Sequence, residues 1–168
     1  MKKRLAAALA LVLLVMLFVP AQAVECQYEI TQAFVDYLDT QGVKYRWEGV
    51  DQDGDEHIRI SFGGKNMDPI VTDWYFDNAR GRVVVRSWNV IDYSISDYYY
   101  VSAALDEANG TYLFVKFYTD DTDNSVTAGY DMPVTGSQDA EQCYEILMRM
   151  INILDDVYPQ LSKYDITD

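Results

Sequence analysis

The residues that most often carry out catalysis or bind metals are scarce in this sequence of 168 residues. It contains one histidine, His57, and two cysteines, Cys26 and Cys143. A serine or cysteine nucleophile that needs a histidine base must therefore use His57. No Gly-x-Ser-x-Gly elbow is present, and one histidine with two widely spaced cysteines cannot complete a tetrahedral zinc shell. We predict no catalytic residue and no zinc site, and we interpret His57 as an exposed residue on the polar face of a strand.

Two acidic clusters are the remaining candidates for metal binding or carboxylate chemistry. The first alternates Asp51, Asp53 and Asp55, as the leading ligands of a helix-loop-helix calcium site do. Its glycine comes fourth instead of sixth, and position twelve is Phe62 instead of a bidentate glutamate. The second cluster, residues 120–123, follows no ligand pattern. Both clusters therefore indicate solvated hairpin turns, and without a phosphate-binding glycine motif we predict neither a metal nor a cofactor.

The N-terminus has the three parts of a secretory signal peptide. Three basic residues precede an apolar run over residues 5–19, and the small residues Ala21 and Ala23 stand where a signal peptidase cleaves. The run is shorter than the ~20 residues that a spanning helix needs. We predict a signal peptide over residues 1–23, one domain over residues 24–168, and no membrane insertion after cleavage. The predicted location is secreted, periplasmic or cell envelope, and an uncleaved membrane anchor is the alternative.

The exported domain is strongly acidic. The whole chain has a formal net charge of −14, and removal of the three basic residues in the signal leaves 10 basic against 27 acidic residues, a net charge near −17. Such a surface repels phosphate backbones and anionic headgroups. The charge therefore argues against nucleic-acid and membrane-surface binding, and solubility outside the cell explains it.

Export also changes how the two cysteines are interpreted. An even number of cysteines in an oxidising compartment favours a disulfide, here between Cys26 and Cys143. It would close a loop of over a hundred residues, a constraint worth about 4 kcal/mol in the chain-entropy model. Two separate buried thiols are the alternative.

Hydrophobic periodicity divides the rest of the chain into three helices and six strands. The expected helices cover residues 27–40, 94–108 and 137–158, and the expected strands cover residues 43–48, 57–62, 70–76, 82–90, 112–118 and 125–132. The first four strands follow one another through short turns, which predicts an antiparallel meander. The order α-β-β-β-β-α-β-β-α predicts an α+β domain whose helices cover one face of an antiparallel sheet.

Capping and breaking residues predict where the later helices begin and end. Asn109-Gly110 is expected to end the second helix, and Ser137 is the expected N-cap of the third. Pro159 is expected to break the third helix, because proline lacks the N–H that a helix interior uses. The polar tail from Ser162 is expected to fray.

Three consecutive tyrosines, Tyr98, Tyr99 and Tyr100, lie in the expected second helix. Successive helical residues are ~100° apart, so at least one of the three rings must point toward solvent or a partner. Tyrosine is common at protein interfaces, because it buries a large area at low entropic cost and keeps a polar tip. These tyrosines are the candidate partner-binding residues, and ordinary packing is the alternative.

The second helix and the hairpin after it carry a longer motif. The sequence reads Leu105-x-x-x-Asn109-x-x-Tyr112-x-x-x-Lys116-x-Tyr118-x-Asp120-Asp121, between a leading helix with a strand meander and a long final helix. Over most of residues 27–160 the chain resembles the YbjN family, the bacterial sensory-transduction-regulator domains. The resemblance implies a fold like that of type III secretion chaperones, which are often dimeric and bind other polypeptides. It implies no enzymatic activity and no established ligand.

Together these features predict an exported, non-enzymatic protein-interaction module with a protein or peptide partner. Its expected binding surface is the sheet face or the region of Tyr98, Tyr99 and Tyr100, and a homodimer is compatible with the resemblance. Two alternatives stay open. One is a secreted hydrolase that uses carboxylates of the acidic turns, and the other is a self-associating structural protein.

Overall fold

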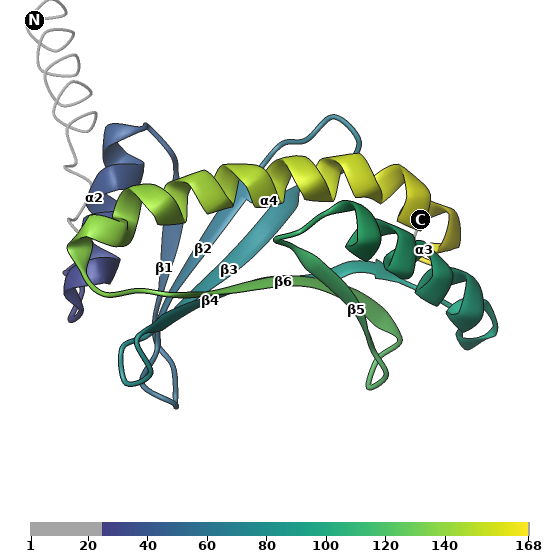
Figure 1. The fold of residues 1–168 in the computed structure, drawn as a ribbon, viewed down its shortest axis with the longest axis horizontal. Helices are drawn as coiled ribbons and strands as arrows, with labels where there is room; N and C mark the ends of the chain where they lie inside the picture. Colours follow the sequence, from purple (N-terminus) through teal and green to yellow (C-terminus); the bar gives the residue numbers. More distant parts are fainter. Residues whose placement is uncertain (1–24, 168) are drawn as a thin grey trace, which may run out of the picture.

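The computed structural model describes residues 25–167, so the predicted signal peptide, residues 1–23, lies outside the described residues. Six antiparallel strands form one sheet in the order β1-β2-β3-β4-β6-β5 (Figure 1). The helices are α2 (Glu29–Thr40), α3 (Tyr98–Thr111) and α4 (Ala140–Leu161). The strands are β1 (Tyr45–Val50), β2 (Glu56–Phe62), β3 (Ile70–Asp77), β4 (Arg82–Asp92), β5 (Lys116–Asp120) and β6 (Ser125–Pro133).

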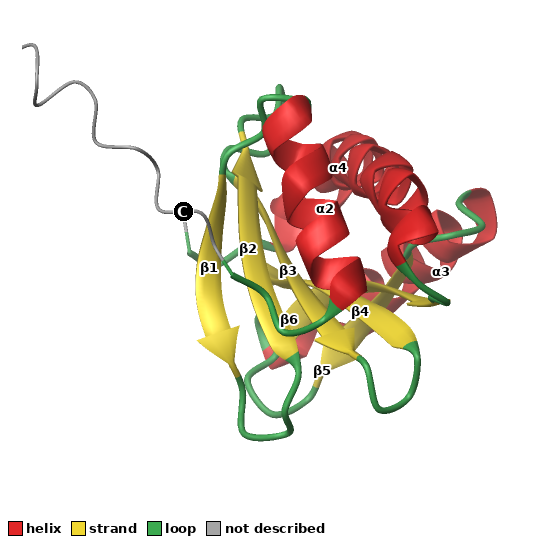
Figure 2. Ribbon diagram, turned by 90° about the vertical axis from the view of Figure 1, so that its left-hand side faces the viewer, coloured by secondary structure: helices red, strands yellow, loops and turns green. Residues whose placement is uncertain are grey.

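The helices cover one face of this sheet and leave the other face open. Figure 2 shows α2 and α4 on the same side of the strands, and α3 contacts both β5 and α4. The element order and the antiparallel pairing confirm the predicted α+β fold. We call the uncovered side the open face.

Strand alternation gives the two faces different chemistry. Ile58 of β2 lies opposite Trp74 of β3, and both side chains are fully buried beneath the helices. The next pair along the same strands, Arg59 and Asp73, lies on the open face, because successive side chains of a strand point to opposite sides.

The core is built from aromatic rings of α2 and β3 and from one apolar stripe of α4. Phe34 of α2 has its ring centroid 4.8 Å from that of Trp74 and 5.6 Å from that of Phe76. The buried residues of α4 recur at helical spacing, namely Ala140, Cys143, Ile146, Leu147, Met150, Ile151, Leu154, Val157 and Leu161. They form one apolar stripe along the helix, and Ile153 beside it is only partly buried.

The second helix does not end at Asn109-Gly110 as predicted, but continues to Thr111. Consequently β5 begins at Lys116 instead of residue 112. The Asn109 side chain explains the difference, because its amide donates to the Phe117 carbonyl and accepts from the Phe117 N–H, both at 2.8 Å. The ammonium of Lys116 donates to the carbonyls of Asn109 and Tyr112 at the end of α3. Asn109 and Lys116 of the motif thus have structural roles.

The third helix begins later than predicted. A short 3-10 turn, Ser137–Asp139, precedes α4, and Ser137 makes no capping hydrogen bond to it. Its hydroxyl instead donates to Glu29 Oε1 at 2.7 Å, which ties the start of α4 to the start of α2. Ser137 is therefore an interhelix contact and not the predicted N-cap.

Pro159 does not break α4, which continues through it to Leu161. Proline cannot donate to the carbonyl of Asp155, four residues earlier. The side-chain amide of Asn66, in the loop between β2 and β3, donates to that carbonyl at 2.9 Å. The Asp155 carboxylate in turn accepts the backbone N–H groups of Asn66 and Met67. The loop therefore supplies the hydrogen bond that proline removes, and it docks on the helix by doing so.

This compensation predicts that Asn66 and Pro159 are energetically coupled. Asn66→Ala is expected to lower the free energy of unfolding by about 1 kcal/mol, because the Asp155 carbonyl loses its donor. In a Pro159→Ala background the helix recovers its own N–H donor, so the same substitution should cost clearly less. Urea unfolding of the four proteins of this double-mutant cycle measures the coupling. Equal losses in both backgrounds would contradict the role assigned to Asn66.

The C-terminal tail is ordered and does not fray as predicted. A 3-10 turn, Ser162–Tyr164, follows α4. Asp165 then forms an isolated antiparallel bridge with Tyr93, and the Ile166 N–H donates to the Asp92 carbonyl at 2.9 Å. Backbone pairing with the end of β4 thus fixes a polar segment whose composition predicts disorder.

Candidate partner-binding surfaces

The open face is held together by a buried carboxylate. The Asp73 side chain is only 3 % exposed and accepts hydrogen bonds from His57 Nε2 at 2.7 Å and from Arg59 Nε at 2.7 Å. The His57 ring also stacks on Tyr75, with centroids 4.4 Å apart. His57 is thus 16 % exposed and paired with a carboxylate, so the prediction of an exposed histidine is wrong. Asp73 therefore links His57 and Arg59 on the open face, and Tyr75 packs on the His57 ring, which indicates a structural role for this histidine.

Arginines gather on the open face even though the chain is acidic. Five of the six arginines in residues 25–167 lie on it or in the turn beside it, namely Arg46, Arg59, Arg80, Arg82 and Arg86. Arg80 and Arg82 both bind the buried carboxylate of Asp77. Burial alone would raise the pKa of Asp77, but these two hydrogen bonds hold it below its ordinary value. Glu48, Asp73 and Asp131 pair with the other three arginines, so the open face carries a network of ion pairs with nearly balanced charge.

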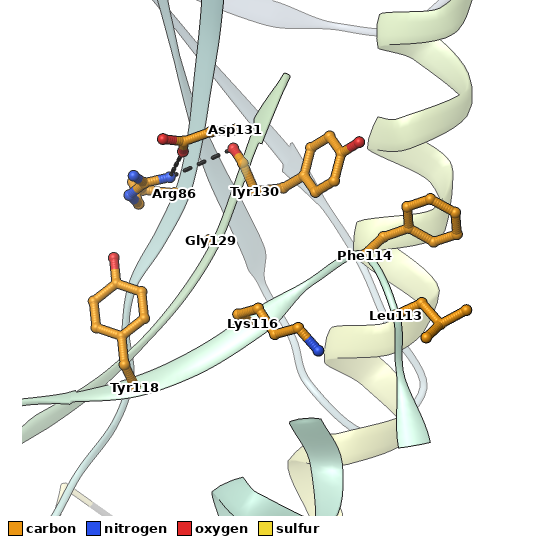
Figure 3. Close-up of a pocket in the computed structure, with 8 residues that line it drawn as sticks. All are labelled: Arg86, Leu113, Phe114, Lys116, Tyr118, Gly129, Tyr130 and Asp131. Atoms are coloured by element: carbon orange, nitrogen blue, oxygen red, sulfur yellow. Dashed lines mark hydrogen bonds and ion pairs between the residues drawn. The ribbon is translucent and has the colours of Figure 1, made fainter. Parts of the chain in front are cut away.

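A hollow of about 340 Å³ lies where β4, β6 and the start of β5 meet (Figure 3). Its lining residues are Arg86, Leu113, Phe114, Lys116, Tyr118, Gly129, Tyr130 and Asp131. Figure 3 shows Arg86 and Tyr118 on one side of it and Leu113 and Phe114 on the other. We call it the Gly129 hollow, because Gly129 contributes no side chain between Arg86 of β4 and Lys116 of β5.

The predicted tyrosines divide between the core and the surface. Tyr98 is half-buried, with its ring centroid 6.5 Å from that of Tyr93. Tyr99 is 83 % exposed and Tyr100 is 64 % exposed. The Tyr100 ring lies nearly parallel to that of Tyr164 in the tail, with centroids 6.3 Å apart. The expectation that at least one ring points outward is confirmed, for Tyr99 and Tyr100.

The structure does not contain the predicted disulfide, and Cys26 and Cys143 are free thiols. Cys26 is half-buried ahead of α2, while Cys143 is buried in α4 against Met132. Burial and the nearby Glu56 carboxylate raise the pKa of Cys26 to about 12, and burial with Asp139 raises the pKa of Cys143 to about 12. The thiolate is the reactive form, so neither cysteine is a good nucleophile at neutral pH.

The acidic turns direct their carboxylates to backbone N–H groups. Asp51 Oδ1 accepts from the N–H groups of Asp53 and Asp55, and Asp120 Oδ1 accepts from that of Thr122. The bond from Thr122 lowers the pKa of Asp120, whereas burial and neighbouring carboxylates raise that of Asp55. Within residues 25–167, no three His, Cys, Asp or Glu side chains are arranged to hold a metal ion. Turn formation accounts for the positions of these acids.

The sequence carries only two weak signals of the Gly129 hollow. A glycine inside a strand often marks a close approach of another group. Leu113 and Phe114 are two large apolar residues in the short segment before β5, and both are exposed. Neither signal identifies the hollow without the register that brings Arg86 beside Gly129.

The fold and these surfaces define a small α+β domain that presents aromatic and cationic side chains for contact with another molecule. The family is more specific. A family profile, YbjN, described as "Putative bacterial sensory transduction regulator", matches residues 80–163. The chain belongs to the YbjN family, which confirms the resemblance seen in the sequence. The matched region contains the three tyrosines and the Gly129 hollow.

A solved structure has the same fold. It is described as "Crystal structure of YbjN, a putative transcription regulator from E. coli", with a TM-score of 0.54 and 16 % sequence identity over 79 % of this chain and 89 % of that chain. None of the curated proteins compared with the chain matches it significantly. The family description names a regulator and no enzyme, which supports a non-enzymatic protein-interaction module at the level of the family. In residues 25–167, no helix is both long and apolar enough to cross a membrane.

Proposed function

We propose that this protein is an exported protein-interaction module that binds a protein or peptide partner through the surface formed by Tyr99 and Tyr100. The observation that carries the proposal is the exposure of two adjacent tyrosines on a helix whose other side is buried in the core. Val101 and Ala104 of the same helix lie in the core, so the exposed rings are held on a fixed support.

The surroundings of the two rings favour a contact surface. Ile95, one helical turn before Tyr99, is 69 % exposed, and Ile166 in the tail is also exposed. Stacking of Tyr100 on Tyr164 restricts that ring before any partner binds. A large amphipathic ring that is already ordered loses little side-chain entropy on binding. The family description as a regulator agrees with a polypeptide partner.

A comparison of captured proteins tests the binding surface. The protein purified from cells that express the full chain is immobilised and exposed to the envelope fraction of its own organism. Tyr99→Ser with Tyr100→Ser is expected to lose the captured partner, because both exposed rings are removed. Val50→Ser, a change at an exposed apolar residue of β1 away from both surfaces, is the matched control. Unchanged capture by a folded double variant would refute the tyrosine surface.

The export part of the proposal has its own test. N-terminal sequencing of the protein recovered outside the cytoplasm is expected to begin at Val24, as cleavage after Ala23 requires. Recovery of the intact chain in the cytoplasm would refute export.

A further inference from the structure

We propose that the Gly129 hollow binds an acidic, extended segment of a partner protein. A carboxylate of the segment would lie against Lys116 and Arg86, and an apolar side chain beside it would lie against Leu113 and Phe114. The inference rests on the proposed function only in taking the partner to be a polypeptide. It concerns a different surface from Tyr99 and Tyr100.

Because Gly129 has no side chain, Arg86 can lie across β6 and form one wall of the hollow. A Cβ atom added to Gly129 would come within 2.9 Å of Arg86 Nη1 and 3.1 Å of its Cδ, so the arginine side chain lies over the glycine. Lys116 is directly opposite Gly129 on β5. The resulting space of about 340 Å³ is at the lower end of the range for ligand pockets, which suits one or two side chains of a peptide.

Lys116 retains one hydrogen-bond donor for a carboxylate. The Lys116 ammonium has three donors, and two of them are directed to the carbonyls of Asn109 and Tyr112. These bonds fix the ammonium at the rim and leave one donor available. Arg86 binds Asp131, so the lining contains two cations and one carboxylate. The local excess of one positive charge is complementary to an acidic ligand.

The apolar side of the hollow is held in place before a ligand arrives. The Phe114 ring packs edge-on against Tyr130 with centroids 6.2 Å apart, and the Arg149 guanidinium lies 5.2 Å from its centroid. Leu113 is 83 % exposed, on a segment that is fixed by the hydrogen bonds of Lys116. An exposed leucine next to an anchored phenylalanine is a surface that an apolar side chain of a partner would bury.

Charge and apolarity together select the chemistry of the segment. A purely apolar segment would leave the third donor of Lys116 without an acceptor, and burying a polar group without a partner costs free energy. A basic segment would place a like charge beside Lys116 and Arg86. An extended segment with acidic and apolar residues in alternation satisfies both halves of the hollow, because its side chains project to opposite sides.

Fluorescence anisotropy with three labelled ten-residue peptides tests this selection. The peptides alternate leucine with glutamate, with glutamine, or with lysine. We expect the Leu–Glu peptide to bind at least tenfold more tightly than the Leu–Gln peptide, and the Leu–Lys peptide to bind most weakly. Equal affinity for the glutamate and glutamine peptides, or no binding of the Leu–Glu peptide at millimolar concentration, would overturn the proposal.

Gly129→Val supplies the structural test, because its side chain pushes Arg86 into the hollow or away from it and removes no charge. Arg86 can move aside at its flexible end, and valine is favoured in strands, so the variant should fold. We expect Gly129→Val to lower the affinity for the Leu–Glu peptide at least tenfold. Leu113→Ser, at an exposed position, should lower the same affinity severalfold. Tyr99→Ser with Tyr100→Ser should leave the peptide affinity unchanged. If both hollow variants fold and bind normally, the site is refuted, whatever the outcome for the tyrosine surface.

Discussion

Trp74→Ala is expected to lower the free energy of unfolding by about 4 kcal/mol, the range found when a large buried aromatic residue is removed. The Trp74 indole is fully buried at the centre of the sheet and stacks on Phe34 of α2 at 4.8 Å. Its Nε1–H donates to Thr72 Oγ1 at 3.1 Å, so the substitution also takes a partner from a buried hydroxyl. Helix α2 therefore loses the ring on which Phe34 stacks, and chemical denaturation followed by far-UV circular dichroism measures the loss of stability.

Trp88→Ala is the matched control for this prediction. Trp88 is in the neighbouring strand, β4, but it is 45 % exposed. Its removal creates no closed cavity and should cost less than about 1 kcal/mol. Similar losses for the two variants would contradict the assignment of Trp74 to the core and Trp88 to the surface.

The core could be predicted because its signals are local. Phe34, Val35 and Leu38 recur at helical spacing in α2, and the same spacing runs along α4. Alternation in β2 places Ile58 and Ile60 on the buried face. Local periodicity is sufficient to assign helices, strands and their buried sides. Apolar residues recur about once per turn on the buried side of a helix and at every second residue on the buried face of a strand.

The predictions of where α3 and α4 end were wrong for the same physical reason. Pro159 remains helical because Asn66, distant in sequence, donates to the carbonyl that proline leaves free. The helix continues through Asn109 because its amide pairs with the backbone of Phe117. In each case a tertiary hydrogen bond reverses a local preference, and a residue's type does not reveal which partner the fold will bring to it.

The candidate surfaces were predictable to different degrees. Helical geometry requires at least one of three consecutive tyrosines to be exposed. The packing of α3 against the rest of the domain determines that the exposed ones are Tyr99 and Tyr100. The Gly129 hollow depends on pairing of three strands, which sets Arg86 and Lys116 on either side of the glycine. Pairing between strands distant in sequence is not encoded in the periodicity of any one strand, so this site emerges only from the fold.

Asp73→Ala is expected to lower the free energy of unfolding by about 3 kcal/mol. Asp73 is the acceptor for both His57 and Arg59, and its removal leaves two donors on the open face without their carboxylate. Breaking a buried ion pair is costly because the remaining charge stays desolvated. The cost is placed at the low end of the usual range, because the Arg59 side chain is partly exposed and water can reach it.

Asp131→Ala is the control that removes an exposed ion pair from the same face. It separates the effect of losing a buried carboxylate from the effect of losing an ion pair. Asp131 binds Arg86, but its side chain is exposed, and exposed ion pairs contribute about 1 kcal/mol or less. Urea unfolding should therefore show a much larger loss for Asp73→Ala than for Asp131→Ala. Equal losses would mean that the burial of Asp73 does not matter. The expected contrast would show that one buried carboxylate holds β2 and β3 in the arrangement on which the ion pairs of the open face depend.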